Sequence, residues 1–200
     1  MPQTLCIETI AVENRCFKNL EYHEARLNKT RRELWGYTDV WKLQDRLSIP
    51  DSLTNHLYKC RMAYHKEIDH IQWEIYHPRQ ILKIRKVYHN SVDYGFKYDQ
   101  RPMLNQLFAQ RGDADEILII KNGMVTDSYV CNVAFLDGNN WFTPDTHLLP
   151  GTQRAQLLDL GIIQETSISE EALTKFSHIK LFNAMVTWEH APVLPIGMIG

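Results

Sequence analysis

The sequence predicts an α+β fold in which a small N-terminal unit precedes a larger C-terminal one. Short stretches rich in β-branched residues alternate with stretches of helical periodicity, and an Asn-Gly pair separates the apolar runs 117–121 and 124–128. Asn-Gly supplies the positive φ values of a two-residue hairpin turn, so those runs predict paired strands. A chain of 200 residues, 44% of them hydrophobic, is long enough to bury a core of its own.

Residues 1–92 are expected to form the N-terminal unit. The partial alternation and β-branched residues of 4–12 predict a strand, and a turn leads to a second short strand over 16–20. A helix is predicted over 21–35, with Gly36 as its C-cap. Its apolar residues fall near one helical face: Tyr22, Leu27, Leu34 and Trp35.

The rest of this unit is predicted to contain one more helix and a hairpin. Pro50 is expected to open a helix that runs to about residue 65. Residues 69–77 and 80–88 predict two strands of a hairpin around Pro78. The turn-forming residues 90–95 are expected to link the two units.

Residues 93–200 are expected to form the C-terminal unit. Pro102 suits an early position of a helix that reaches Gln110. After the Asn-Gly hairpin, the pattern predicts strands near 132–137 and 141–143, a loop entering a helix over 151–161 and a late strand over 178–186.

Composition excludes several classes of function. The net charge is −2, from 22 basic and 24 acidic residues, whereas nucleic-acid binding through phosphates favours a basic excess. The apolar runs fall far short of the roughly 20 residues that a membrane helix needs, and the N-terminus lacks the pattern of a secretory signal. Four widely spaced cysteines without a C-x-x-C pair favour a reduced, cytoplasmic chain.

Two segments have the chemistry of a cofactor site. Lys97 lies among aromatic residues, and an amine desolvated by such neighbours loses proton affinity, as imine formation requires. A surface lysine that packs along aromatic rings is the simpler interpretation. Residues 148–154 place Gly151 in a turn before a helix, where free N–H groups can hold a phosphate, although an ordinary helix entry has the same pattern.

Two charged residues extend this set. Asp127 ends a predicted strand and could pair with a cationic ring nitrogen, or be a solvated turn residue. Arg26 could hold a phosphate from the inner side of its helix, or lie on the surface in an ion pair. No metal is expected, because His56, Cys60, His65 and His70 follow no recognised ligand spacing.

The order of these motifs along the chain resembles the class IV aminotransferases, the pyridoxal-phosphate (PLP) enzymes of fold type IV. The similarity covers about residues 4–35 and 94–195, and residues 36–90 carry none of the motifs. The matching motifs are Ile7-Glu8-Thr9-Ile10, His23-x-x-Arg26-Leu27, Lys97-x-x-x-Arg101, Val125-Thr126-Asp127 with Asn132, Thr143-Pro144, Leu149-Pro150-Gly151-x-x-Arg154 and Asn183-Ala184. The resemblance implies a small N-terminal α/β domain and a C-terminal domain whose mixed, barrel-like sheet is flanked by helices.

The resemblance also implies a role for each candidate residue. Lys97 would form a Schiff base with PLP and then carry the proton between the substrate and the cofactor. Asp127, in the place of the family's glutamate, would keep the pyridine nitrogen protonated, and Leu149 would pack on the ring. The phosphate would be held by Arg26, Gly151, Thr152, Gln153 and Asn183.

Two departures from the family leave the reaction open. Asp127 is one methylene shorter than glutamate, and Thr152-Gln153 replaces the common Ile-Thr pair. The resemblance implies an enzyme acting on a small-molecule amino substrate, as a homodimer, and favours aminodeoxychorismate lyase, which releases pyruvate and forms 4-aminobenzoate. An aminotransferase acting on a small amino acid and a 2-oxo acid is the alternative, and an inactive family member serving as a binding module is a third.

Overall fold

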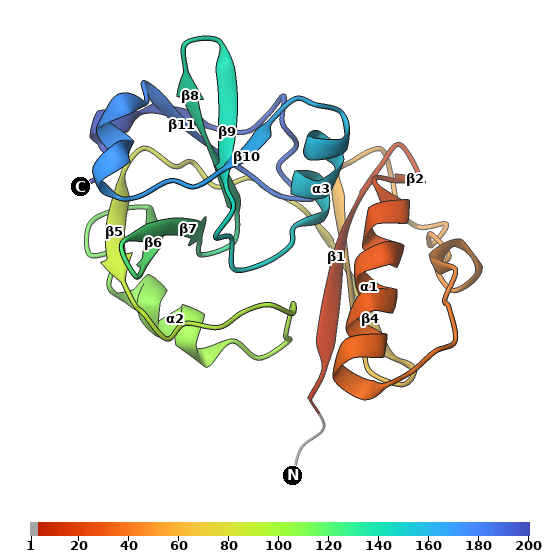
Figure 1. Ribbon diagram of the computed structural model, residues 1–200. Coiled ribbons are helices and arrows are strands. Elements are labelled where there is room, and N and C mark those ends of the chain that lie inside the picture. The colour runs from red at the N-terminus through yellow and green to blue at the C-terminus, as the bar shows by residue number, and fades with distance from the viewer. Residues whose placement is uncertain (1–3) are drawn as a thin grey trace. The chain divides into compact units, whose positions relative to one another are not determined.

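The computed structural model describes residues 4–200 (Figure 1), which divide into two compact units. The N-terminal unit runs up to Pro78 and includes Phe96–Gln100, and the C-terminal unit comprises Arg79–Gly95 and Arg101–Gly200. We expected one division, between residues 92 and 93. The observed division differs because the strand after Arg79 pairs within the C-terminal unit, whereas the segment carrying Lys97 bonds to the first strand of the chain.

The N-terminal unit is an antiparallel sheet with one long helix beside it. The strand order is β2-β1-β3-β4, and the helix α1 packs against β1 (Figure 1). The elements are β1 (Cys6–Glu13), β2 (Cys16–Phe17), α1 (Leu20–Trp35), the 3-10 turn η1 (Leu43–Asp45), β3 (Tyr58–Tyr64) and β4 (Ile68–Ile75). The predicted strand over 4–12 and helix over 21–35 are therefore confirmed.

The C-cap predicted at Gly36 is also confirmed. Gly36 has φ 73°, and its N–H bonds back to the carbonyls of Arg31 and Arg32. Glycine adopts this left-handed conformation without the steric cost that a Cβ adds, so the helix ends here. Leu27 of the same helix is fully buried in the core between helix and sheet.

The helix predicted from Pro50 to about residue 65 is wrong. Residues 58–64 instead form β3, in which Tyr58, Cys60, Met62 and Tyr64 enter one core. This alternation has the period of a strand, and pairing with β1 and β4 on either side stabilises it.

The hairpin predicted around Pro78 is also wrong. Both strands exist, but β4 pairs with β3 in one unit, whereas β5 (Ile84–Tyr88) pairs in parallel with β6 (Glu116–Lys121) in the other. Strand partners depend on contacts distant in sequence, which local patterns do not contain.

The C-terminal unit contains two sheets. The smaller has the order β5-β6-β7 and the larger the order β10-β9-β8-β11-β12. Its further elements are α2 (Pro102–Ala109), β7 (Met124–Ser128), β8 (Asn132–Asp137), β9 (Asn140–Pro144), α3 (Thr152–Asp159), β10 (Gln164–Thr166), η2 (Glu171–Lys175), β11 (His178–Phe182), β12 (Val193–Pro195) and η3 (Ile196–Met198). Strands of both sheets share one apolar core, to which Ile84, Leu118, Val133 and Ile179 contribute.

The predicted α+β class is confirmed, whereas the barrel-like sheet is not. Over residues 4–200 the strands do not close into a barrel. The predicted Asn-Gly hairpin is present between β6 and β7, with φ 52° at Asn122 and 76° at Gly123. Across the same residues, no helix is both long and apolar enough to span a bilayer.

Candidate active site

A buried carboxylate organises the polar residues of the N-terminal unit. Glu8 lies on β1 and is completely inaccessible to solvent. Arg26 donates from Nε to Oε1 at 3.0 Å and from Nη2 to Oε2 at 2.6 Å. His23, one turn earlier on α1, contacts Oε2 through Nδ1 at 2.6 Å. The i, i+3 spacing places His23 and Arg26 on the same face of the helix, towards Glu8.

The charges in this cluster follow from its partners. Burial opposes ionisation of Glu8, but Arg26 and the hydrogen bond from His23 hold its pKa at about 2. Burial lowers the pKa of His23, so its ring is neutral near pH 7. Because Glu8 is ionised, the proton of that neutral ring must lie on Nδ1 and be donated to the carboxylate.

Lys97 belongs to the same unit and lies near this cluster. Its carbonyl accepts a hydrogen bond from the backbone N–H of Ile7 at 2.8 Å, and its charge contributes to the lowered pKa of His23. The side chain is half-buried. Lys97, the residue that we expect to bind PLP, is therefore close enough to α1 for its charge to act on His23.

Asp127 is the buried carboxylate of the C-terminal unit. Its Oδ2 accepts the backbone N–H groups of Leu148 and Leu149, both at 2.9 Å, and its Oδ1 accepts Nδ2 of Asn132 at 2.8 Å. Burial raises its pKa to about 6, against the opposing effect of these hydrogen bonds. Asp127 is therefore not the solvated turn residue that the sequence left open.

Asn132 and Gly151 fit closely together beside this carboxylate. Besides binding Asp127, Nδ2 of Asn132 donates to the carbonyl of Leu149 at 3.0 Å. A Cβ at position 151 would lie 1.8 Å from Oδ1 of Asn132, so glycine is required there for space, since its φ of −69° suits any residue. The loop before α3 is thus fixed to Asp127.

The first turn of α3 contains the predicted phosphate cradle. Thr152 and Gln153 are buried at its start, and Leu149, half-buried, precedes them in the loop. Arg154 is fixed in the same turn by the carbonyl of Pro144 and by Glu165. The first N–H groups of a helix and its positive dipole end favour an anion.

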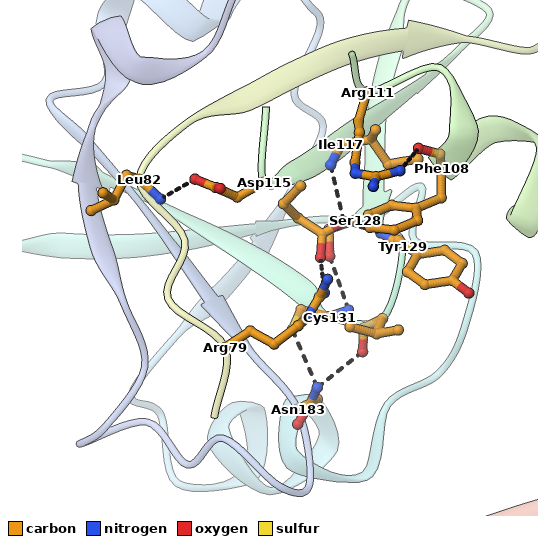
Figure 2. Close-up of polar contacts among 12 residues, drawn as sticks. Arg79, Leu82, Phe108, Arg111, Asp115, Ile117, Ser128, Tyr129, Cys131 and Asn183 are labelled. Atoms are coloured by element: carbon orange, nitrogen blue, oxygen red, sulfur yellow. Dashed lines mark hydrogen bonds and ion pairs between the residues drawn. The ribbon is translucent and has the colours of Figure 1, made fainter. Parts of the chain in front are cut away.

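Asn183 holds the turn between β7 and β8. Its Nδ2 donates to the carbonyl of Val130 at 3.1 Å and to Sγ of Cys131 at 3.2 Å (Figure 2), and its Oδ1 accepts the N–H groups of Met185 and Val186. Its recorded hydrogen bonds thus support the turn that joins Asp127 to Asn132.

A second carboxylate supports that turn from the other side. Glu116 is fully buried and accepts the N–H groups of Ile117 and Tyr129 on Oε1. Arg79 donates to Oε2 at 3.1 Å, and Figure 2 shows Arg79 pointing into this group. Burial raises the pKa of Glu116 in spite of these donors.

The expected site residues fall into two sets. Lys97 and Arg26 lie in the N-terminal unit, and the C-terminal unit contains the others: Asp127, Leu149, Gly151, Thr152, Gln153 and Asn183. The sequence motifs contained Glu8, His23 and Asn132, but we assigned them no role. A charged residue within a strand of apolar residues was the available signal for Glu8.

Each of the two sets, taken by itself, has side chains of the kind that PLP requires. A buried carboxylate of raised pKa suits a cationic ring nitrogen, a helix N-terminus suits a phosphate, and a half-buried lysine suits a covalent bond to an aldehyde. Within residues 4–200 no group of three or more His, Cys, Asp or Glu side chains could hold a metal ion.

Comparison with known proteins identifies the family of this chain. The family model of class IV amino-transferases matches residues 84–194, more than half of the chain. The chain therefore belongs to the class IV aminotransferase family, which confirms the expectation of an enzyme.

Individual relatives support the same assignment. An uncharacterized protein of Haemophilus influenzae is 41% identical over 180 residues, covering 89% of this chain and 96% of the relative. The crystal structure of a "putative 4-amino-4-deoxychorismate lyase" from Haemophilus somnus has a TM-score of 0.85 and 32% identity, covering 94% of this chain and 99% of the other. An aminotransferase from Brucella abortus, bound to the cofactor PLP, has a TM-score of 0.76 over 96% of this chain and 79% of its own. At 17% identity, it shows the fold alone.

Proposed function

We propose that this chain is a PLP-dependent lyase that acts on 4-amino-4-deoxychorismate, releasing pyruvate and 4-aminobenzoate. The observation that carries the cofactor assignment is Asp127, a buried carboxylate of raised pKa whose three recorded donors are all neutral. The substrate assignment is supported by the Haemophilus somnus relative, which is similar over almost its whole length.

In this proposal each residue acts on PLP through its own chemistry. Lys97 supplies the amine that binds the cofactor and holds the proton that moves during the reaction. Asp127 stabilises a proton on the ring nitrogen, so that the bound ring can accept electrons. Arg26, Gly151, Thr152 and Gln153 bind the phosphate, and Leu149 packs on the ring.

In this proposal Asn183 supports the turn between Asp127 and Asn132. Its hydrogen bonds fix the backbone between Asp127 and Asn132. We also propose that the protein is a homodimer located in the cytoplasm. If light scattering finds a monomer in solution, the proposed dimer is wrong.

Covalent binding of PLP at Lys97 is the first test. With added PLP, the purified protein should absorb at about 410–430 nm, as lysine-bound PLP does, and borohydride should fix the label on the peptide that contains Lys97. Lys97→Ala should remove the absorbance, and Lys29→Ala, at an exposed position of α1, should keep it. A colourless wild-type protein would support a binding module without catalytic activity.

The reaction is tested separately on the coloured protein. Incubation with 4-amino-4-deoxychorismate should release 4-aminobenzoate and pyruvate, and Lys97→Ala should release neither. Exchange of an amino group between an amino acid and a 2-oxo acid, without release of 4-aminobenzoate, would instead establish an aminotransferase.

A further inference from the structure

The segment around Lys97 is fixed to the N-terminal unit on both sides of the lysine. After Pro78 the chain returns to this unit over Phe96–Gln100. The N–H of Ile7 donates to the carbonyl of Lys97 at 2.8 Å, and the N–H of Asp99 donates to the carbonyl of Leu5 at 2.9 Å. A bond from the N–H of Tyr98 to the carbonyl of Phe96, at 2.9 Å, closes a γ-turn centred on Lys97.

A side-chain ion pair ties the same segment to a second strand. Arg61, on β3, donates from Nη2 to Oδ1 of Asp99. The two side chains are 22% and 17% exposed, so the pair is better shielded from water than an ordinary surface pair. Partial burial opposes ionisation of Asp99, but the hydrogen bonds from Arg61 and Gln100 hold its pKa below the usual range.

We propose that the ion pair between Arg61 and Asp99 positions Lys97 and, because the two charges balance, keeps either of them from shifting the proton affinity of its amine. This inference rests on the proposed function, in which Lys97 must lose a proton before it bonds to PLP. Asp99 follows Lys97 by two residues, so an unpaired charge on either partner would act on the amine. The paired state keeps the two opposite charges balanced and the turn fixed to β1 and β3.

The pair acts alongside other titratable or charged groups of the same unit. These are Glu8 on β1, His23 and Arg26 on α1, and His70 on β4, whose charge contributes to the lowered pKa of Asp99. Glu8 and Arg26 already neutralise each other. The variants below leave all four groups in place, so changes in the behaviour of Lys97 report on Arg61 and Asp99.

The test measures covalent attachment of PLP to Lys97 as a function of pH. Attachment is stopped with borohydride at set times, and the label on the Lys97 peptide is quantified by mass spectrometry. Asp99→Asn leaves Arg61 unpaired, which should lower the midpoint pH of attachment, and Arg61→Gln should raise it. Each shift should be about 0.5 to 1.5 units, the effect of one nearby charge in a polar environment.

The double variant separates the effect of charge from that of position. Asp99→Asn combined with Arg61→Gln should return the midpoint to the wild-type value, because both charges are gone. The maximal attachment rate should be about tenfold lower in all three variants, because the turn keeps its backbone bonds to β1 but loses its side-chain link to β3. Circular dichroism verifies that each variant is folded, and Arg61→Lys, which keeps the charge, should keep the midpoint and lower the rate.

Lys59 and Glu74 provide matched controls. They form an ion pair of 3.1 Å between β3 and β4 of the same sheet. Lys59→Gln and Glu74→Gln should leave both the midpoint and the maximal rate unchanged. The inference alone is overturned if Asp99→Asn and Arg61→Gln have the same midpoint pH as these controls. It is also overturned if both midpoints shift in the same direction. Failure of the wild-type protein to label at Lys97 would overturn the proposed function as well.

Discussion

Replacing Gly151 with alanine should destabilise the protein through a single contact. The new Cβ would lie 1.8 Å from Oδ1 and 3.0 Å from Cγ of Asn132, so the asparagine side chain must move. Movement breaks its bonds to the Asp127 carboxylate and to the Leu149 carbonyl. A hydrogen bond to a charged group is worth about 1.5–3 kcal/mol and a neutral one about 1 kcal/mol, which gives a loss of about 3 kcal/mol.

Thermal and urea unfolding measure this loss. For a chain of this length, about 3 kcal/mol corresponds to a fall in Tm of about 6–12 °C. Gly197→Ala is the control, because a Cβ at position 197 meets no atom within 4 Å and the backbone there is not left-handed. The Gly197 variant should unfold within about 0.5 kcal/mol of the wild type.

A double-mutant cycle assigns the loss to Asn132. In an Asn132→Ala background the clash is gone, so Gly151→Ala should cost less than about 0.5 kcal/mol. An unchanged cost in that background, or a cost below about 0.5 kcal/mol in the wild type, would refute the explanation.

Two buried carboxylates should respond to pH in opposite directions. The pKa of Asp127 is raised in the folded protein, so its ionisation disfavours folding. The stability of the wild type relative to Asp127→Asn should therefore fall by about 2.4 kcal/mol as pH rises from 4 to 7. Urea unfolding at both pH values measures the stability difference between wild type and variant, with Asp145→Asn at an exposed position as control. A stability difference that does not change with pH would contradict the prediction. Glu8→Gln should cost about 3–5 kcal/mol at pH 7, because Arg26 and His23 lose their buried partner. Since the pKa of Glu8 is lowered, the stability that the wild type gains over Glu8→Gln should shrink as pH falls from about 4.5 towards 2. The control is Glu21→Gln at an exposed position, which should cost under about 0.5 kcal/mol at pH 7.

Local sequence signals predicted the elements that local interactions stabilise. The cap at Gly36, the Asn-Gly turn and the start of α2 at Pro102 each depend on the conformation of one or two residues. The strand β3 was predicted as a helix because its buried face becomes evident only from its partners on both sides. The separation of β4 from β5 likewise depends on pairings distant in sequence.

The candidate site shows the same limit. Lys97 and Asp127 were selected from the order of the motifs, but nothing local to Asp99 distinguishes it from an exposed loop residue. Its partner Arg61 lies on β3, opposite Thr9 of β1, and that register is set by the whole sheet. Residues that bind a cofactor leave a pattern in the sequence, whereas residues that position them depend on the fold.

The difference between Glu8 and Asp127 explains why the C-terminal unit favours a cationic group. Burial penalises both carboxylates, but Glu8 has the guanidinium of Arg26 in direct contact, so its charge is already compensated. Asp127 receives only neutral hydrogen-bond donors in the described structure. The charge of Arg154 lowers the pKa of Asp127 only weakly and without a hydrogen bond. A cation placed against Asp127 would recover the free energy that burial costs, whereas a second cation at Glu8 would meet Arg26 and gain little. Binding of a protonated ring nitrogen should therefore lower the pKa of Asp127 and stabilise the ionised carboxylate that burial disfavours.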